Sequence, residues 1–382
     1  MGLGAFGFFG LFWGVFAVLL TDLSRSLQLS PGSLGLALFV GAAASILAMA
    51  TLGWTADRLG RRLFLLLTGT VLGFGIAGLA LSNSYAALLA TLVVLYSASG
   101  LYDVGINSAA VDLEQATGSR YMALVHAAFS AGATVGAVGA GVMVQAGADY
   151  RAVYLVLLVP LALLLLAFAN TRLPTVEQHN PEENNRWAHY ALYRHLPLLL
   201  VGGIATLGLG SEGEMEHWSG IYLRDTLGLP ALLGGSGVAV FYAAMAAGRL
   251  GTAGAVRLFG NRVTLLCAGL FTAAGMGLAL VTREPVLVVG GFLIVGLSLS
   301  GVAPIAFSLA GDVAPGGTGA AVSVVTTLGY GGFLLGPVIV GGLAELTGLR
   351  TALLTIAAAG LVIAILALRV STAGGPPKTA SR

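Results

Sequence analysis

The chain has few charged residues and one cysteine, and each shortage excludes a class of protein. Asp, Glu, Lys and Arg make up 9% of its 382 residues, whereas soluble domains carry about 25%. A net charge of +2 gives no electrostatic basis for binding nucleic acid. The single Cys267 excludes an internal disulfide. The chain has no H-E-x-x-H motif, no G-x-x-x-x-G-K-[ST] phosphate loop and no histidine cluster with metal spacing, so we expect no enzyme, metal or cofactor.

Apolar residues are abundant instead. They form 57% of the chain, and the mean hydropathy is +0.93. A helix needs roughly 20 apolar residues to cross the hydrocarbon of a bilayer, whereas barrel strands need about ten. The sequence therefore predicts an all-α membrane protein with twelve transmembrane helices in the lipid bilayer. We expect the spans at 3–22, 33–54, 63–81, 85–110, 121–145, 151–169, 196–222, 233–250, 262–282, 285–310, 318–343 and 350–369.

The distribution of positive charge predicts the orientation. If both termini are cytoplasmic, 13 of the 18 Lys and Arg residues lie on the inner side and 5 on the outer side. The positive-inside rule favours this arrangement over its inverse. We expect a multi-pass protein of the bacterial inner membrane with both termini in the cytoplasm.

The two halves of the chain repeat at an offset of 200 residues. Gly60, Arg62 and Asp112 match Gly260, Arg262 and Asp312, and charge matches carry weight because charges are scarce. Six spans followed by six in the same orientation form a parallel repeat. The predicted domains are an N-terminal six-helix bundle (1–170), a cytoplasmic linker (171–194), a C-terminal six-helix bundle (195–370) and a disordered tail (371–382).

A run of charge and glycine, Gly53–Arg62, separates the second and third spans. Its pattern G-x-x-x-D-R-x-G-R-R resembles the signature loop of the major facilitator superfamily of transporters. The resemblance covers the whole chain and implies two pseudo-symmetric bundles that work by alternating access. It implies a cytoplasmic gate in which Asp57 meets the eleventh helix and Arg61 meets Asp112. The gate residues are Gly53, Asp57, Arg58, Gly60, Arg61, Arg62 and Asp112. A plain positively charged loop is the alternative.

Ionisable residues within the spans point to chemistry, because a charge in hydrocarbon costs about 3 kcal/mol or more. Asp103 lies nine residues before Asp112, about 13 Å along the fourth helix and near the midplane. Asn107 lies one turn away on the same face. His126 in the fifth helix reaches a similar depth. An Asp103–His126 pair is a candidate proton carrier, and a purely structural role for each residue is the alternative.

The seventh span carries Glu212, Glu214 and Glu216 within five residues, followed by Trp218. Three ionised carboxylates must face water, carry protons or find partners. The nearby glycines allow a bent or broken helix. The alternatives are that Glu214 and Glu216 are solvated at the outer mouth or that one glutamate closes an outer gate. We expect Glu212, the deepest, to join Asp103 and His126 in proton coupling. The expected substrate-binding residues are Asn107, Glu214, Glu216, Trp218 and Tyr330.

Three short motifs suggest a narrower function. Asp103-x-x-x-Asn107, His126-x-x-x-Ser130-x-Gly132 and Glu212-x-x-x-x-x-Trp218-Ser219 resemble the fucose-permease-like branch of the superfamily, which implies a proton-driven sugar symporter. We expect a monomeric, proton-coupled secondary active transporter of a small polar, sugar-like solute. One alternative is a proton-coupled exporter of drugs or lipophilic cations, which the acidic run would attract. Another is a sensor that binds a solute without moving it.

Overall fold

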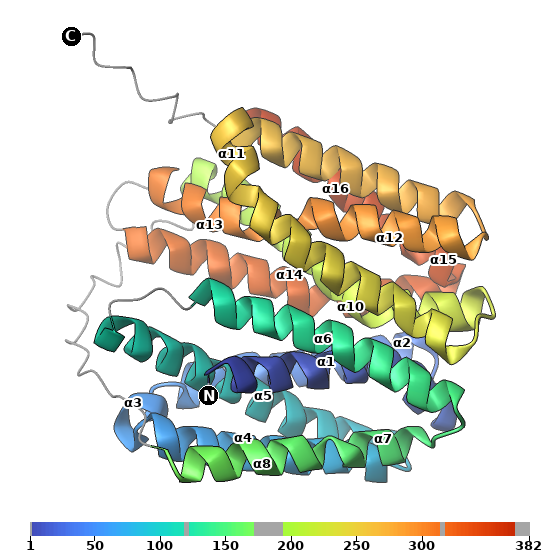
Figure 1. Cartoon of the computed structure of the whole chain (residues 1–382). Coiled ribbons are helices and arrows are strands. Elements are labelled where there is room, and N and C mark those ends of the chain that lie inside the picture. The colour runs from blue at the N-terminus through green and yellow to red at the C-terminus, as the bar shows by residue number, and fades with distance from the viewer. Residues whose placement is uncertain (1, 118–121, 172–193, 314–317, 371–382) are drawn as a thin grey trace. The chain divides into compact units, whose positions relative to one another are not determined.

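The computed structural model describes residues 2–117, 122–171, 194–313 and 318–370 (Figure 1). These residues form helices and connecting turns, with no strand among them. Apart from Thr171 and Arg194, the predicted linker lies outside the described residues, and so does the predicted tail.

The described residues of the first half form eight helices. The second and third spans are joined by the short α3, and the sixth span is divided at Leu157 into α7 and α8. The helices are α1 (Gly2–Ser26), α2 (Pro31–Leu52), α3 (Thr55–Leu59), α4 (Arg61–Leu81), α5 (Tyr85–Thr117), α6 (Met122–Gln145), α7 (Tyr150–Val156) and α8 (Leu158–Ala169).

The second half begins with the seventh span, which ends in a π-helical turn. The elements are α10 (Leu196–Ile221), η1 (Tyr222–Thr226), α11 (Ala231–Val281), α12 (Pro285–Leu299), α13 (Val302–Val313), α14 (Thr318–Thr347), α15 (Leu349–Ala352) and α16 (Leu354–Arg369). Helices α12 and α13 together make one span, and α15 and α16 make another.

The twelve predicted spans are confirmed. Eleven segments of the described chain are long and apolar enough to cross a membrane, and one of them, α11, has 51 residues. Gly260 interrupts α11 with φ 78° and ψ 165°, and Figure 1 shows the helix turning sharply. Because this backbone conformation suits only glycine, Gly260 divides α11 into the eighth and ninth spans.

The backbone repeats as the sequence does. Six described residues have φ in the left-handed region. They form three pairs, each separated by 200 or 201 residues: Gln28 with Gly228, Gly60 with Gly260, and Gly147 with Gly348. Each pair lies in or beside a connection between helices. The two halves of the chain therefore turn at corresponding points, as expected for a duplicated six-helix unit.

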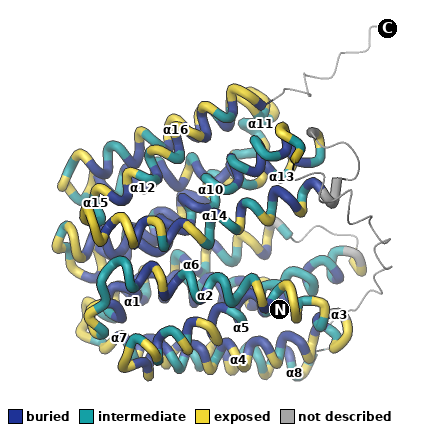
Figure 2. The backbone as a smooth tube through the Cα atoms, turned by 180° about the vertical axis from the view of Figure 1, so that it is seen from behind, coloured by how far each residue is buried: buried dark blue, intermediate teal, exposed yellow. Residues whose placement is uncertain are grey.

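By backbone contacts, the described chain divides into two compact units. The first contains Met1–His179, His217–Tyr242 and Gly341–Leu349, and the second contains Asn180–Glu216, Ala243–Val340 and Arg350–Arg382. The first unit thus includes the end of α10, all of η1 and the start of α11. In Figure 2, buried and exposed residues alternate along individual helices, as expected for helices with one packed and one open face.

Within the first unit, α1 packs closely against α6 through glycines. A Cβ on Gly10 would lie 1.9 Å from the Phe129 carbonyl oxygen, and a Cβ on Gly132 would lie 2.0 Å from that of Gly7. Gly136 is similarly close to Leu11 O. Such close approach is typical of small residues between membrane helices. Gly132 and Gly136 of the fifth span therefore serve helix packing.

Candidate functional site

The signature loop is built around a buried ion pair. Gly60, with φ 78°, lets the chain turn from α3 directly into α4. This turn places Arg61 in the first turn of α4, where its Nε lies 2.8 Å from Asp112 Oδ2 on α5. The two side chains are only 4% and 0% exposed. The pairing that the resemblance implies is therefore present.

The other residues of the loop have different surroundings. Gly53 closes α2 by donating its N–H to Met49 O, and Arg62 donates to Ala169 O at the end of α8. Arg58 is exposed, with its guanidinium 5.8 Å from the centre of the Trp54 ring. The Asp57 side chain and residues 314–317 before α14 lie outside the described residues. The predicted contact of Asp57 with the eleventh helix stays a prediction.

Asp103 lies within α5 and is half-buried. The Asn107 amide, one turn further on, donates to Asp103 Oδ1 at 2.9 Å and to the Asp103 carbonyl oxygen at 2.9 Å. The predicted shared face is therefore confirmed. The partner of this carboxyl oxygen is therefore a neutral amide.

His126 lies near the start of α6 with an exposed ring, 5.1 Å from the Phe6 ring in an edge-on contact. This contact explains how α1 and α6 pack at this point, but it does not connect His126 to Asp103. The Asp103–His126 proton pair stays a prediction.

Glu212 on α10 has a cationic partner. Its Oε1 accepts a hydrogen bond of 3.0 Å from Arg249 Nη2 on α11. The Glu212 side chain is 17% exposed and that of Arg249 is 39% exposed. The guanidinium neutralises Glu212, which makes this acid tolerable within a membrane span.

Glu214 has a neutral partner instead. It is 7% exposed, and its Oε2 lies 2.8 Å from the Thr355 hydroxyl on α16. The same hydroxyl lies 2.8 Å from Ala352 O. Glu214 also lies against the backbone of α14, where a Cβ on Gly336 would come within 3.1 Å of Glu214 Cγ. The side chain therefore occupies space that the glycine leaves open.

The remaining predicted substrate contacts differ in burial. Glu216 is 7% exposed and Trp218 is fully buried, whereas Tyr330 on α14 is 47% exposed. Among the described residues, no hydrogen-bond acceptor meets the Trp218 indole N–H. The glycines do not break the helix at the acidic run: α10 is continuous through all three glutamates. The irregularity follows at η1, where Tyr222–Thr226 form a π-helix, a feature often found at functional sites.

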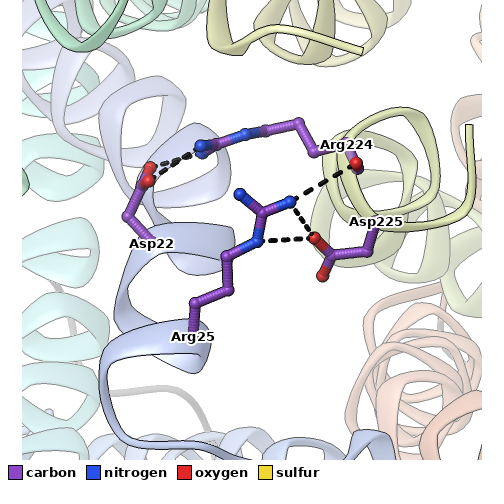
Figure 3. Close-up of polar contacts among 4 residues, drawn as sticks. All are labelled: Asp22, Arg25, Arg224 and Asp225. Carbon is purple, nitrogen blue, oxygen red and sulfur yellow. Dashed lines mark hydrogen bonds and ion pairs between the residues drawn. The ribbon is translucent and has the colours of Figure 1, made fainter. Parts of the chain in front are cut away.

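Two ion pairs join η1 to the end of α1 (Figure 3). Both terminal guanidinium nitrogens of Arg224, Nη1 and Nη2, donate to the Asp22 carboxylate, and Nη2 does so at 2.8 Å. Arg25 Nε donates to Asp225 Oδ1 at 2.8 Å. Each element thus contributes one acid and one base. This four-residue ion-pair cluster lies at the opposite end of the spans from the signature loop, because α2 separates the two sites along the chain.

A hydrogen bond between two helices lies in the same unit. Tyr96 OH on α5 lies 3.2 Å from His217 Nε2 on α10, and both residues are buried. Trp13 of α1 contacts the Tyr96 ring edge-on at 5.2 Å, and Phe16 contacts His217 at 6.4 Å. These rings, the aromatic cluster, pack α1 against α5 and the end of α10.

Comparisons with known proteins decide the family. The family model of the Major Facilitator Superfamily matches residues 2–257 and 236–382. An uncharacterized MFS-type transporter of Yersinia pestis is 31% identical over 367 residues, 94% of each chain. The membrane protein MosC of Rhizobium meliloti is 28% identical over 362 residues, which cover 94% of this chain and 87% of MosC.

The chain belongs to the major facilitator superfamily. It is therefore a multi-pass membrane transporter and not an enzyme. A structure of the nucleoside transporter NupG superposes with a TM-score of 0.80 at 16% identity, over 97% of each chain. A bacterial homolog of the human lysosomal transporter Spinster gives a TM-score of 0.73 at 16% identity, over 97% of this chain and 95% of that one. These similarities show the fold: twelve helices in two six-helix bundles.

Sequence reasoning about this major facilitator missed the ion-pair cluster and the partners of the glutamates. Asp22 and Arg25 lie one turn apart at the end of a span, where charges are ordinary. Arg249 lies at the end of the predicted span 233–250, where a positive charge is ordinary too. The one available signal was the repeat, because Arg25 and Asp225 occupy matching positions at the 200-residue offset with opposite charge.

Proposed function

We propose that the chain is a proton-coupled secondary active transporter that moves a small polar, sugar-like solute by alternating access. The observation that carries the proposal is a set of carboxyl groups within membrane spans whose partners are neutral. Asp103 binds the Asn107 amide and Glu214 binds the Thr355 hydroxyl. Carboxyl groups are costly in a membrane and are retained there for function. A neutral partner leaves such a group able to gain or lose a proton without breaking an ion pair.

Polar and aromatic groups beside these acids suit a hydroxylated solute. The Asn107 amide and the Glu214 and Glu216 carboxyls supply hydrogen-bond donors and acceptors, and Trp218 and Tyr330 supply flat apolar faces. Under this proposal Asp103 and His126 handle protons, whereas Glu212, which the sequence placed with them, is held in an ion pair by Arg249. Asn107, Glu214, Glu216, Trp218 and Tyr330 contact the solute. The coupling ion is the proton, and the transporter works as a monomer.

Alternating access requires a gate at each membrane face. We assign the inner gate to the signature loop with its Arg61–Asp112 pair, and the outer gate to the ion-pair cluster of Asp22, Arg25, Arg224 and Asp225. This assignment places both termini in the cytoplasm at a bacterial inner membrane, in agreement with the positive-inside bias. The moving bodies are the bundles 1–170 and 195–370, joined by the linker 171–194.

A second candidate is proton-coupled export of drugs or lipophilic cations. The observation that favours it is burial: two of the glutamates on α10, Glu214 and Glu216, are only 7% exposed. Buried carboxylates attract cations, and aromatic faces bind them. The two candidates therefore differ in the charge of the solute.

Thermal unfolding of the purified protein against a solute panel separates these candidates. The panel contains sugars, nucleosides, organic ions and lipophilic cations. Nucleosides are included because NupG is a nucleoside transporter. A ligand at a hundredfold excess over its dissociation constant stabilises the folded state by about 2.7 kcal/mol. We expect stabilisation by a neutral hydroxylated solute. Stabilisation by cations alone would favour the exporter over the symporter. The Asp103→Asn variant is the control and measures how much that acid contributes to the stabilisation by solute.

A further inference from the structure

We infer that Glu214 is protonated in this structure and is the residue of α10 that carries the coupling proton, with Thr355 as its positioning residue. The inference rests on the proposed proton coupling and deepens it. It assigns to Glu214 the role that the sequence suggested for Glu212.

The first argument is a count of hydrogens around Thr355. Its Oγ1 lies 2.8 Å from Glu214 Oε2 and 2.8 Å from Ala352 O, both ordinary O–H···O distances. A threonine hydroxyl has one hydrogen. If Glu214 is ionised, that hydrogen can serve only one of the two acceptors well, and the other contact brings two oxygens together without a proton. If Glu214 is protonated, it donates to Thr355 Oγ1, which donates to Ala352 O, and both contacts are satisfied.

The second argument is the charge around Glu214. Two arginines of the same unit have acceptors elsewhere: Arg249 binds Glu212 at 3.0 Å, and Arg350, at the start of the span that holds Thr355, donates to Leu280 O at 2.6 Å. On α10 itself, Glu212 and Glu216 are acids and would disfavour a further negative charge. On α14, the neighbour at Glu214 is the backbone at Gly336.

The third argument is the contrast with Glu212. Its Oε1 accepts from the Arg249 guanidinium, and protonating Glu212 would leave the charge of Arg249 unpaired in a membrane span. Glu212 is therefore suited to remain ionised, whereas Glu214 can change state. Loss of the proton from Glu214 gives a carboxylate and a proton that passes to water. The Thr355 hydroxyl then turns from Ala352 O to donate to the carboxylate.

Infrared difference spectra between mildly acidic and alkaline buffer test the assignment on the purified full-length protein without solute. A protonated carboxyl has its own C=O stretching band, separate from that of a carboxylate. We expect Glu214→Gln to remove one such band and the matched control Glu212→Gln to retain it. If the band persists in Glu214→Gln, the assignment is wrong.

The frequency of the Glu214 C=O band tests the positioning role of Thr355. Thr355→Val removes the hydroxyl but keeps the shape of the side chain, so the band of Glu214 should shift to higher frequency. Thr355→Ser keeps the hydroxyl and should leave the band in place. Identical spectra for Val and Ser variants would overturn the inference, and this pair decides the question even if Glu214→Gln does not fold. Failure of the proposed function is a different result: the band is present, but no solute moves protons across proteoliposomes.

Discussion

Arg224 of η1 holds the Asp22 carboxylate of α1 with two guanidinium nitrogens (Figure 3). The side chains are 7% and 17% exposed, so water screens this pair little. Gly234 at the start of α11 makes room for it, because a Cβ there would lie 2.2 Å from Arg224 Cγ. The π-helical turn and the glycine together accommodate a large cation between helices.

Replacing Arg224 with Gln should strongly destabilise the protein in detergent. Removing one member of a buried ion pair leaves the other charge unpaired and costs about 3–5 kcal/mol. The measurement is thermal or denaturant unfolding of the purified variant. Arg25→Gln is the matched control, since the Arg25–Asp225 pair is 52% and 36% exposed and such pairs contribute about 0–1 kcal/mol.

The charge-swapped variant Asp22→Arg with Arg224→Asp separates pairing from packing. If the ion pair supplies the stability, the double variant should recover part of what each single change loses, with a coupling of about 1–3 kcal/mol. Additive losses in this double-mutant cycle would show that Arg224 acts through packing.

Arg61→Gln should be nearly as damaging as Arg224→Gln, because Arg61 and Asp112 are even less exposed. We expect a loss of about 3–5 kcal/mol in unfolding experiments. Arg61→Lys should not fully restore stability, because an ammonium lacks the planar fork of the guanidinium. The neighbouring Arg58 is exposed, so Arg58→Gln is the control and should leave unfolding almost unchanged. Equal effects at both positions would contradict a special role for the buried pair.

Gly132→Ala should disrupt the packing of α1 on α6. The added Cβ would lie 2.0 Å from Gly7 O, so the helices must separate at a cost of about 2–3 kcal/mol or more. Gly139→Ala on the same helix meets nothing within 4 Å and should be neutral or mildly stabilising. The measurement is the melting temperature of the two variants side by side. Equal melting temperatures would show that α1 and α6 adjust freely.

Asp103→Asn should uncouple transport from protons while leaving the fold intact. The variant keeps a hydrogen-bonding group for Asn107 and cannot ionise. We expect exchange of solute across proteoliposomes to continue and accumulation against a gradient to be lost. Unchanged accumulation would remove Asp103 from the coupling mechanism.

Much of the fold could be predicted from the sequence, since membrane spans must be long and apolar and their charges must lie at the ends. Matching Gly60 to Gly260 even located the turn that divides α11 into two spans. The Arg61–Asp112 pair could be predicted because Arg61 belongs to a recognisable loop, and the family resemblance implies an acid at the end of the fourth span as its partner. The paired turns at Gln28 and Gly228 and at Gly147 and Gly348 extend the same repeat, although the sequence alone did not single them out.

The partners of the acids on α10 could not be predicted in the same way. Thr355 lies 141 positions after Glu214, and which face of α16 meets α10 depends on packing that no local pattern encodes. The same holds for Asp22 and Arg224, whose charges look like ordinary span ends. The glycines of α10 allow a broken helix, but the helix is unbroken, and Gly213 lies against Phe333 instead.

The central claim is that solute movement and proton movement are coupled. Proteoliposomes that contain the purified protein and an internal pH indicator test this claim with the solute that gives the largest thermal stabilisation. Adding that solute outside should change the internal pH for the wild type, in proportion to uptake, and should not change it for Asp103→Asn. Uptake of the solute by the wild type with no change in internal pH would contradict proton coupling.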